Sequence, residues 1–307
     1  MTVVSFAAVE KRYGATTALD KMSLDVRRGE MFGLIGPDGA GKTTAIRLMC
    51  GLLRADAGTI RVLGADPVRE HRRITERVGY LSQRFSLYGD LTIDENIAFF
   101  AEIHGVRGYA ARRESLLQMT ALTPFRTRLA DRLSGGMKQK LALACTLVHE
   151  PDLIVLDEPT TGVDPVSRRE FWKLLSEFLA TGVTILMSTP YLDEAERCTR
   201  VALLHEGRVL ALDEPGRLRA LMPGRMVEVM AGSTPRLLDI VRRMPGVDDA
   251  QMFGERVHVR LRDADEEAVQ RFVAAMQGTP LARAAVRPVP PSLEDVFIAR
   301  LTAKEVQ

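Results

Sequence analysis

The sequence predicts an α/β protein with a mostly parallel, helix-covered sheet, followed by a small α+β domain. Over residues 1–222, short apolar runs of strand length alternate with helical patterns, the order expected for a parallel sheet. The pair Pro223-Gly224 interrupts this alternation, and a shorter pattern of strands and helices begins after it. We therefore expect one domain over 1–222 and a second over 223–307.

The N-terminal part of the first domain is dominated by short strands. The run MFGLI at 31–35 is continuously apolar, which is typical of a buried strand. The other strands expected in this part are 3–9, 22–26, 58–64 and 78–82.

A helical subdomain is expected at about 84–145, because the pattern turns helical from about Asp90 to Cys145. Thr92 followed by Glu95 is a capping-box pattern, which predicts that a helix begins there. After this subdomain, Asp164 before Pro165 predicts another helix start, and that helix ends at Gly182. The strands expected around it are 153–158, 183–189 and a hairpin over 201–212 that turns at Glu206-Gly207.

The second domain has a β-α-β-α-β pattern, which favours a compact module of the split-βαβ type. The acidic run from Asp263 to Glu267 is interpreted as a solvated helix start. The strands are expected at 226–230, 256–262 and 282–289, and the helices at 235–244 and 265–276.

Charge and composition exclude several classes of protein. The chain has 307 residues, with 42 basic and 40 acidic side chains and a formal charge of +2, which argues against a general nucleic-acid-binding surface. Cys50, Cys145 and Cys198 lie in apolar segments and are expected to be buried thiols in a reducing compartment. No cysteine and histidine cluster has metal-ligand spacing.

The apolar runs are too short for a membrane span. Examples are 153–156 and 183–187, whereas a spanning helix needs ~20 residues. The N-terminus lacks the basic start, apolar stretch and cleavage site of a secretory signal. We expect that this polypeptide does not cross a bilayer.

A phosphate-binding loop is the first functional motif. GPDGAGKT at 36–43 fits G-x-x-x-x-G-K-[ST] and lies between a predicted strand and a predicted helix. Its glycines let backbone N–H groups point at phosphate oxygens, Lys42 would reach the β- and γ-phosphates, and the Thr43 hydroxyl would bind Mg²⁺. The expected nucleotide-contacting residues are Gly36, Pro37, Asp38, Gly39, Ala40, Gly41, Lys42, Thr43 and Thr44.

Two carboxylates end the predicted strand at 153–158. Asp157 is expected near the metal ion, through water. Glu158 can polarise a water molecule in line with the γ-phosphate, which is the positioning role that phosphoryl transfer requires. Together with the phosphate-binding loop, these residues predict a nucleoside triphosphatase that uses Mg²⁺.

The segment LSGGMKQK at 133–140 resembles the signature of ATP-binding-cassette (ABC) proteins. Ser134, Gly135 and Gly136 can present a second cluster of N–H groups at a helix start. The resemblance implies that this cluster closes on the γ-phosphate held by an opposite subunit, so that ATP joins two cassettes. The partner cassette can be identical, giving a homodimer, or different, giving a heterodimer.

The resemblance covers residues 1–222 and implies further roles. Tyr13 resembles the aromatic side chain that stacks on adenine, although a tyrosine after a strand could simply pack. Gln83 resembles the glutamine that contacts Mg²⁺ and the attacking water, and the segment 84–90 behind it would face a membrane partner. Residues 162–164 resemble the loop that communicates across the dimer.

Two positions depart from the family pattern. The family normally has histidine two residues after Ser188, whereas this chain has Pro190, which has no donor for the γ-phosphate. Because Glu158 is retained, we expect slow or partner-dependent hydrolysis, with the partner supplying the histidine or with a reduced rate. Asp38 stands where asparagine is common, and we expect its carboxylate to turn away from the nucleotide.

The C-terminal segment 289–301, VPPSLEDVFIARL, is similar to the tail of ATPases that serve ABC-2 type exporters. The resemblance implies an ATP-hydrolysing subunit that drives a separate ABC-2 type permease from the cytoplasmic face of the membrane. It also implies membrane contact only through that permease. The C-terminal domain would be structural or dimer-stabilising, or else regulatory.

Other functions are considered and disfavoured by particular features. A soluble ABC ATPase acting on ribosomes or DNA is the main alternative, but the chain has one cassette and no heptad-rich insertion. A GTPase would need an N-K-x-D element, and the only asparagine is Asn96. A kinase would leave the segment 133–140 unexplained.

Overall fold

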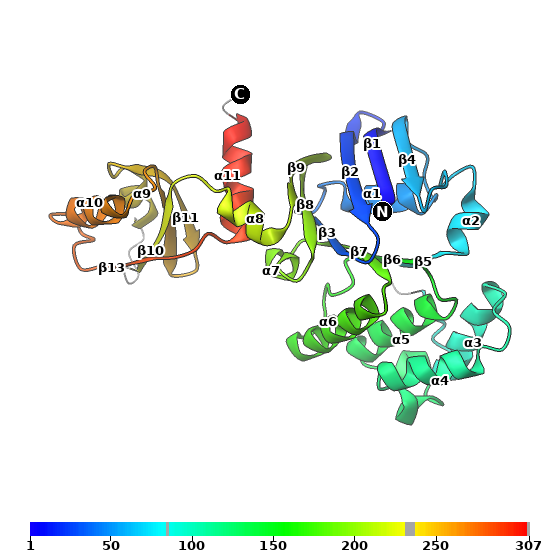
Figure 1. The fold of residues 1–307 in the computed structure, drawn as a ribbon. Helices are drawn as coiled ribbons and strands as arrows, with labels where there is room; N and C mark the ends of the chain where they lie inside the picture. The colour runs from blue at the N-terminus through cyan, green and yellow to red at the C-terminus, as the bar shows by residue number, and fades with distance from the viewer. Residues whose placement is uncertain (84–85, 231–236, 306–307) are drawn as a thin grey trace. The chain divides into compact units, whose positions relative to one another are not determined.

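The computed structural model describes residues 1–83, 86–230 and 237–305. It divides the chain into two compact units, Met1–Glu214 and Pro215–Gln307. The division falls before α8 (Pro215–Ala220), which the sequence pattern assigns to the first domain. This helix packs on the C-terminal helix α11 (Leu293–Glu305), so it belongs to the second unit (Figure 1).

A six-stranded sheet forms the centre of the first unit, in the order β5-β6-β7-β3-β8-β9. Five strands are parallel and β9 pairs antiparallel with β8, which confirms the predicted parallel sheet. Every residue of β3, β6 and β7 is buried, as expected for strands covered on both faces. The strands are β3 (Met31–Ile35), β5 (Val78–Leu81), β6 (Leu153–Asp157), β7 (Thr184–Thr189), β8 (Arg200–His205) and β9 (Arg208–Asp213).

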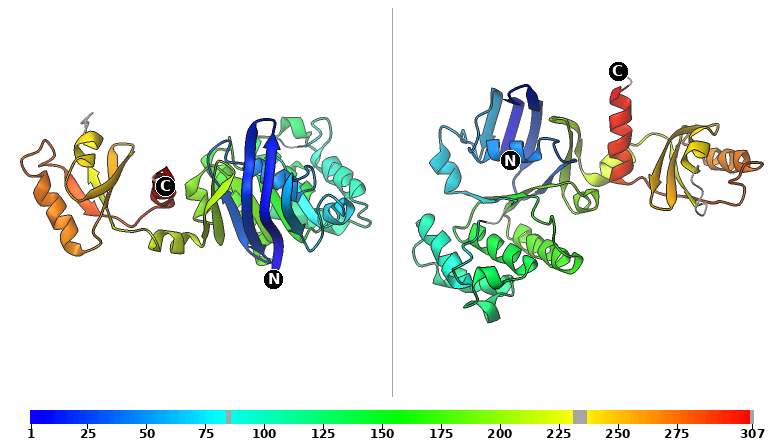
Figure 2. Two further views of the ribbon diagram at one scale, coloured as in Figure 1. Left: turned by 90° about the horizontal axis from the view of Figure 1, so that it is seen from above. Right: turned by 180° about the vertical axis from the view of Figure 1, so that it is seen from behind.

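A second, antiparallel sheet has the order β2-β1-β4. Its strands are β1 (Thr2–Tyr13), β2 (Thr16–Arg27) and β4 (Ala57–Val62), and the first two are longer than predicted. Figure 2 shows these long strands side by side at the N-terminal end of the colour scale. Helix α1 (Lys42–Met49) contacts β2, β4 and β6, so it is shared by the two sheets.

The predicted helix starts are confirmed by their caps. The Thr92 hydroxyl accepts the Glu95 amide at 3.2 Å, and the Glu95 carboxylate accepts the Thr92 amide at 2.8 Å. Asp164 caps α6 (Pro165–Ala180) by accepting two amides of its first turn. The other helices of this region are α3 (Ile93–Ile103), α4 (Ala110–Met119), the 3₁₀ turns Thr123–Phe125 and Ala130–Arg132, and α5 (Gly135–Leu147).

Two short helices of the first unit were not predicted, α2 (His71–Thr75) and α7 (Leu192–Ala195). Each is too short to show a helical repeat of apolar residues. The β8–β9 hairpin turns as expected, with φ of 47° at Glu206 and 75° at Gly207, the positive values that a tight two-residue hairpin turn requires.

The second unit contains a four-stranded antiparallel sheet in the order β11-β12-β10-β13. The predicted β-α-β-α-β order is wrong by one strand, because it lacks β11. Only Ala250 is buried in β11, so the strand shows no apolar alternation. With it, the order β-α-β-β-α-β is that of a complete split-βαβ module. Its elements are β10 (Arg225–Met230), α9 (Leu237–Arg242), β11 (Val247–Phe253), β12 (Arg256–Leu261), α10 (Glu266–Met276) and β13 (Ala285–Pro288).

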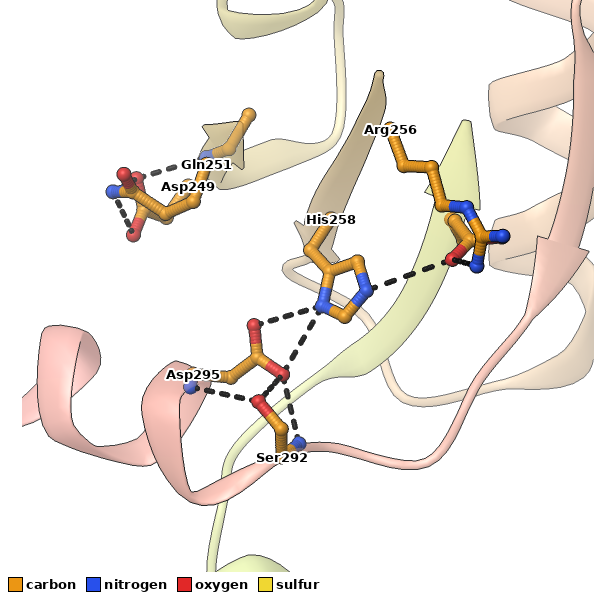
Figure 3. A network of polar contacts seen from close by, with 8 residues as sticks. Asp249, Gln251, Arg256, His258, Ser292 and Asp295 are labelled. Atoms are coloured by element: carbon orange, nitrogen blue, oxygen red, sulfur yellow. Dashed lines mark hydrogen bonds and ion pairs between the residues drawn. The ribbon is translucent and has the colours of Figure 1, made fainter. Parts of the chain in front are cut away.

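A polar network around the buried carboxylates of Glu228 and Asp295 anchors the start of α11 to this sheet (Figure 3). Ser292 and Asp295 form a reciprocal cap, with the Ser292 amide donating to Asp295 at 2.8 Å and the Asp295 amide donating to Ser292 Oγ at 3.1 Å. His258 Nδ1 lies 3.1 Å from Asp295 Oδ1. Next to it, Glu228 accepts hydrogen bonds from Arg256 at 3.2 Å and Arg287 at 2.7 Å.

The three cysteines are buried free thiols, as predicted. Burial, and secondarily the charge of Asp157, raises the pKa of Cys50 to about 12, so this thiol is uncharged at neutral pH. Throughout residues 1–83, 86–230 and 237–305, no helix combines the length and apolarity needed to traverse a bilayer. Across these same ranges no group of three or more acidic, histidine or cysteine side chains could hold a metal ion by itself.

Candidate functional site

The glycine-rich loop between β3 and α1 has a conformation that side chains would disturb. Gly39 and Gly41 have φ of 79° and 99°, values that favour glycine. A Cβ on Gly41 would lie 2.6 Å from the Ala18 carbonyl oxygen, and one on Gly36 would collide with the Leu204 carbonyl. No side chain caps the N-terminus of α1, so its first amides remain available to an anion.

Lys42 is buried beneath this loop, with 4% of its side chain exposed. Its ammonium group donates to the carbonyls of Gly36 at 2.8 Å and Pro37 at 3.1 Å. It also lies 3.1 Å from Glu158 Oε1. The cation is thus shared between the loop and a carboxylate, within reach of any phosphate that the loop binds.

Asp157 lies at the end of β6 and accepts hydrogen bonds from two hydroxyl groups. Thr43 Oγ1 is 3.1 Å and Ser188 Oγ 2.7 Å from Asp157 Oδ1. The last contact crosses between neighbouring strands, because Asp157 pairs with Ser188 in the β6–β7 register. Hydroxyl and carboxylate oxygens are the donors that Mg²⁺ prefers, so the chemistry of this group fits the predicted metal ion.

Glu158 is held in a strained position at the floor of the site. Its φ is 48° although it is not glycine, and such conformations cost about 1–3 kcal/mol and are typical of functional sites. Its amide donates to Ser188 Oγ at 3.0 Å. Its other carboxylate oxygen accepts a hydrogen bond from Gln83 Nε2 at 3.2 Å and one from the Thr161 hydroxyl at 3.4 Å.

A cleft of about 560 Å³ lies over these groups, within the usual range for small-molecule sites. It brings together the predicted Tyr13, Gln83 and Glu158 with the glycine-rich loop. Tyr13 is 48% exposed, so its ring is accessible. The lining residues are Tyr13, Thr16, Thr17, Ala18, Asp38, Gly39, Gly41, Lys42, Thr43, Thr44, Gln83, Glu158, Thr161, Pro190 and Tyr191.

Comparison with known proteins agrees with this geometry. The profile of the ABC transporter family matches residues 19–161, which include the loop and both carboxylates. The Nod factor export ATP-binding protein I of Burkholderia orbicola (strain AU 1054) is 37% identical, over 99% of this chain and 98% of that protein. This chain belongs to the ABC transporter ATP-binding proteins.

A second relative of this chain is the probable multidrug ABC transporter ATP-binding protein YbhF of Escherichia coli (strain K12). It is 41% identical over 96% of this chain, and the chain spans about half (51%) of that relative's length. Among solved structures, an ATP-binding subunit of an ABC transporter matches with a TM-score of 0.65 and 32% identity, over 71% of this chain and 92% of that one.

Another solved structure is a dimeric ATP-binding cassette in a post-hydrolysis state, bound to ADP and phosphate. It matches with a TM-score of 0.61 and 25% identity, over 69% of this chain and 98% of that one. These likenesses confirm the predicted ABC cassette fold.

The segment 133–140, which resembles the ABC signature, lies outside the cleft. Ser134 caps α5 by accepting the Met137 amide at 3.3 Å. A Cβ on Gly136 would collide with the Ser167 side chain, so close packing between α5 and α6 already requires glycine there. None of Ser134, Gly135 and Gly136, all within the described residues, contributes to the cleft lining. One chain alone therefore does not bring the signature to its own loop.

The segment after β7 carries the departure from the family pattern. Pro190 lines the cleft at the position where the family has histidine. The neighbouring Thr189 hydroxyl donates to the buried Glu194 at 2.7 Å and accepts the Tyr191 amide at 3.1 Å. Glu194 also accepts the Thr160 hydroxyl at 2.7 Å. The backbone around Pro190 is thus fixed from both sides.

Several contributors to the site were not predicted from the sequence. In the sequence, Ser188 serves only to locate the position of the missing histidine. In the structure, its hydroxyl donates to Asp157 and accepts the Glu158 amide. Thr161 lies three residues after Glu158, and this spacing could have suggested a contact. Residues 16–18, at the start of β2, carry no sequence signal, because only sheet pairing brings them to the loop. Of the predicted segment 84–90, residues 84 and 85 lie outside the described residues.

Proposed function

We propose that this chain is the ATP-binding and ATP-hydrolysing subunit of an ABC-2 type exporter. It acts at the cytoplasmic face of the membrane beside a separate permease. The observation that carries the proposal is the coupled set of buried groups at the cleft floor, in which Lys42 contacts Glu158 and Thr43 contacts Asp157. The names of its relatives, which describe multidrug transport and Nod factor export, support the assignment to export.

ATP binding uses groups that are already in place. The loop amides and the N-terminus of α1 receive the phosphate oxygens, and the exposed ring of Tyr13 stacks on adenine. Lys42 exchanges its contacts with the loop carbonyls and Glu158 for contacts with the β- and γ-phosphates. Because Lys42 then leaves Glu158, binding frees that carboxylate to accept a hydrogen bond from water.

Hydrolysis converts ATP and water to ADP and phosphate. Glu158 accepts the hydrogen bond of the attacking water and aligns it with the γ-phosphate, while Gln83 fixes the orientation of Glu158. Thr43, Asp157 and Gln83 are the residues that would hold Mg²⁺, which would supply neutralisation of negative charge during phosphoryl transfer. Ser188 keeps Asp157 oriented toward Thr43.

The second half of the ATP site comes from another cassette. Ser134, Gly135 and the α5 N-terminus of the partner approach the γ-phosphate, which explains why these residues lie away from their own cleft. The partner cassette is identical or supplies a histidine at its position equivalent to Pro190. A soluble ATPase acting on ribosomes or DNA finds no support in the named relatives.

The proposal is tested by substituting Glu158→Gln and measuring molecular mass with and without ATP by light scattering. The amide retains the hydrogen-bonding shape but is a poor base, so ATP remains bound and a dimer accumulates. Glu177→Gln, an exposed position on α6, is the matched control and is expected not to trap a dimer. A Glu158→Gln protein that binds ATP and stays monomeric would show that the clamp proposal is wrong for a homodimer, and mixing with a partner cassette would then test the heterodimer.

A further inference from the structure

A second hollow in the first unit carries an excess of positive charge. It has a volume of about 330 Å³ and is formed by the end of α1, the segment 53–55, strand β4 and the segment 66–69. Three arginines line it, Arg54, Arg61 and Arg69. We call this hollow the arginine groove. It shares no lining residue with the nucleotide cleft, so nucleotide binding does not explain it.

The three guanidinium groups are exposed. In the described part of the chain, none of them makes a hydrogen bond or an ion pair within 4.0 Å through its side chain. Three guanidiniums without a hydrogen-bond partner around one hollow leave many N–H donors pointing at solvent. The groove therefore offers guanidinium N–H donors to which no acceptor of the described protein is bonded.

The nearby carboxylates are already engaged by other groups. Asp66 accepts the amides of Val68 and Arg69, each at 3.0 Å. Glu70 accepts the Asp66 amide at 2.8 Å and the Arg73 guanidinium at 3.2 Å. The backbone hydrogen bonds from Arg69 to Asp66 and from Asp66 to Glu70 lower the pKa of both carboxyls, and the charge of Arg61 lowers both further without a direct contact. Among the described residues, Asp66 is the only carboxylate in the lining, so three cations outnumber one anion.

Exposed aliphatic side chains lie beside the arginines. Leu52 is 54% and Val68 39% exposed. Their loops touch, since a Cβ on Gly51 would collide with the Pro67 carbonyl. Exposed aliphatic groups next to free guanidiniums are the composition of surfaces that meet phospholipid headgroups.

We propose that the arginine groove binds the phosphate group of an anionic ligand. Guanidinium groups match phosphate oxygens with paired, charge-assisted hydrogen bonds. The phosphate could belong to an anionic phospholipid headgroup or to a free phosphate in solution, and the chemistry of recognition is the same. The exposed Leu52 and Val68 make the lipid the first source to test.

The first experiment measures sedimentation of the chain with vesicles. One set is phosphatidylcholine and the other is equal parts phosphatidylcholine and phosphatidylglycerol, both with a non-hydrolysable ATP analogue filling the nucleotide cleft. The groove variant combines Arg54→Gln, Arg61→Gln and Arg69→Gln. The control combines Arg243→Gln, Arg262→Gln and Arg283→Gln, three exposed arginines of the second unit. We expect binding only to the anionic vesicles, weakened about 10- to 100-fold in the groove variant and unchanged in the control.

The second experiment titrates inorganic phosphate against sodium chloride of equal ionic strength and follows thermal unfolding of the same three proteins. Phosphate that raises the unfolding temperature of wild type and control, but not of the groove variant, supports the site with a free phosphate as its source. Loss of vesicle binding in the groove variant alone supports the lipid source. If the wild type binds neither probe, or if the control loses as much as the groove variant, the proposal is overturned.

Discussion

The nucleotide cleft and the network beneath α11 are both built from buried, mutually bonded polar side chains, and only one of them is a ligand site. In the network, Glu228 is fixed by two arginines and Asp295 by its own helix cap. In the cleft, Lys42 is shared between carbonyls and a carboxylate that a phosphate can replace. Burial and pairing are therefore common to both sites and do not distinguish them.

Two features separate the regions. The cleft has a volume of about 560 Å³, whereas the hollow beside His258 and Asp295 has about 10 Å³, too little for a ligand. Glu158 has a strained backbone, while none of Glu228, His258 and Asp295 has a positive φ. Accessible volume, rather than the number of bonds, thus distinguishes the site where a ligand exchanges with protein contacts.

Lys42→Ala should have the largest effect of the substitutions that test the difference between the cleft and the network. It removes the cation that the phosphate would take over and leaves Glu158 buried without its partner, so ATP affinity should fall by about 2–5 kcal/mol, measured by titration calorimetry. Lys173→Ala, on the exposed face of α6, is the control. An affinity for ATP that stays close to wild type would mean that Lys42 has only a structural role, like the arginines around Glu228.

Asp295→Ala should show that the network is structural. It removes the cap of α11 and the carboxylate bonded to His258 Nδ1, and we expect a loss of about 2–4 kcal/mol of unfolding free energy. Denaturant unfolding with hydrogen exchange of α11 measures this, and ATP affinity should not change. The exposed Asp239→Ala serves for comparison, with a loss of a few tenths of a kcal/mol. A drop in ATP affinity in Asp295→Ala would contradict the separation of the two regions.

Two stacked histidines in the first unit form a third group of partly buried polar side chains, one that contains no carboxylate. His104 and His149 are stacked with centroids 3.8 Å apart. Burial, and then the charge of His104, lowers the pKa of His149 to about 4, and burial also lowers the pKa of His104. Because folding lowers the pKa of this histidine, the unfolded chain takes up its proton first as the pH falls from about 6.5 towards 4. The free energy of unfolding should therefore fall over this range, by about 1–3 kcal/mol.

Thermal unfolding between pH 7 and pH 4 checks this third prediction. His149→Gln should flatten the acid dependence, whereas His71→Gln on the exposed start of α2 should leave it intact. An unchanged pH profile in His149→Gln would place the acid sensitivity elsewhere.

Pro190→His should have the smallest effect. It tests whether a side chain at position 190 can reach the γ-phosphate in the cleft. A histidine there gains a donor for the γ-phosphate, and we expect about tenfold faster steady-state ATP hydrolysis. Pro190→Ala separates the new donor from the loss of the proline ring. Equal rates in the histidine and alanine variants would show that the fixed backbone around Thr189 prevents a side chain at 190 from reaching the phosphate.

The local features of the site could be predicted from the sequence because each depends on neighbouring residues. The loop at 36–43 and the carboxylates at the end of β6 are motifs that are recognised from their spacing, and the helix cap at Thr92 was predicted in the same way. Ser188 and residues 16–18 could not be placed, because their roles depend on the β6–β7 register and on the pairing of β1 with β2. Strand β11 was not predicted for a similar reason, because it is specified by pairing with β12 rather than by apolar residues.

In the proposed ATP clamp, Gly136 would satisfy two demands at one position. Its lack of a side chain is needed by the contact with Ser167 inside a single chain, whatever a second cassette does. A substitution at Gly136 would therefore damage the fold and the dimer together, and a loss of activity there would carry no information on assembly. A Cβ added at Gly135 would meet no atom within 4 Å, so a bulky residue at 135 would report on the companion subunit alone.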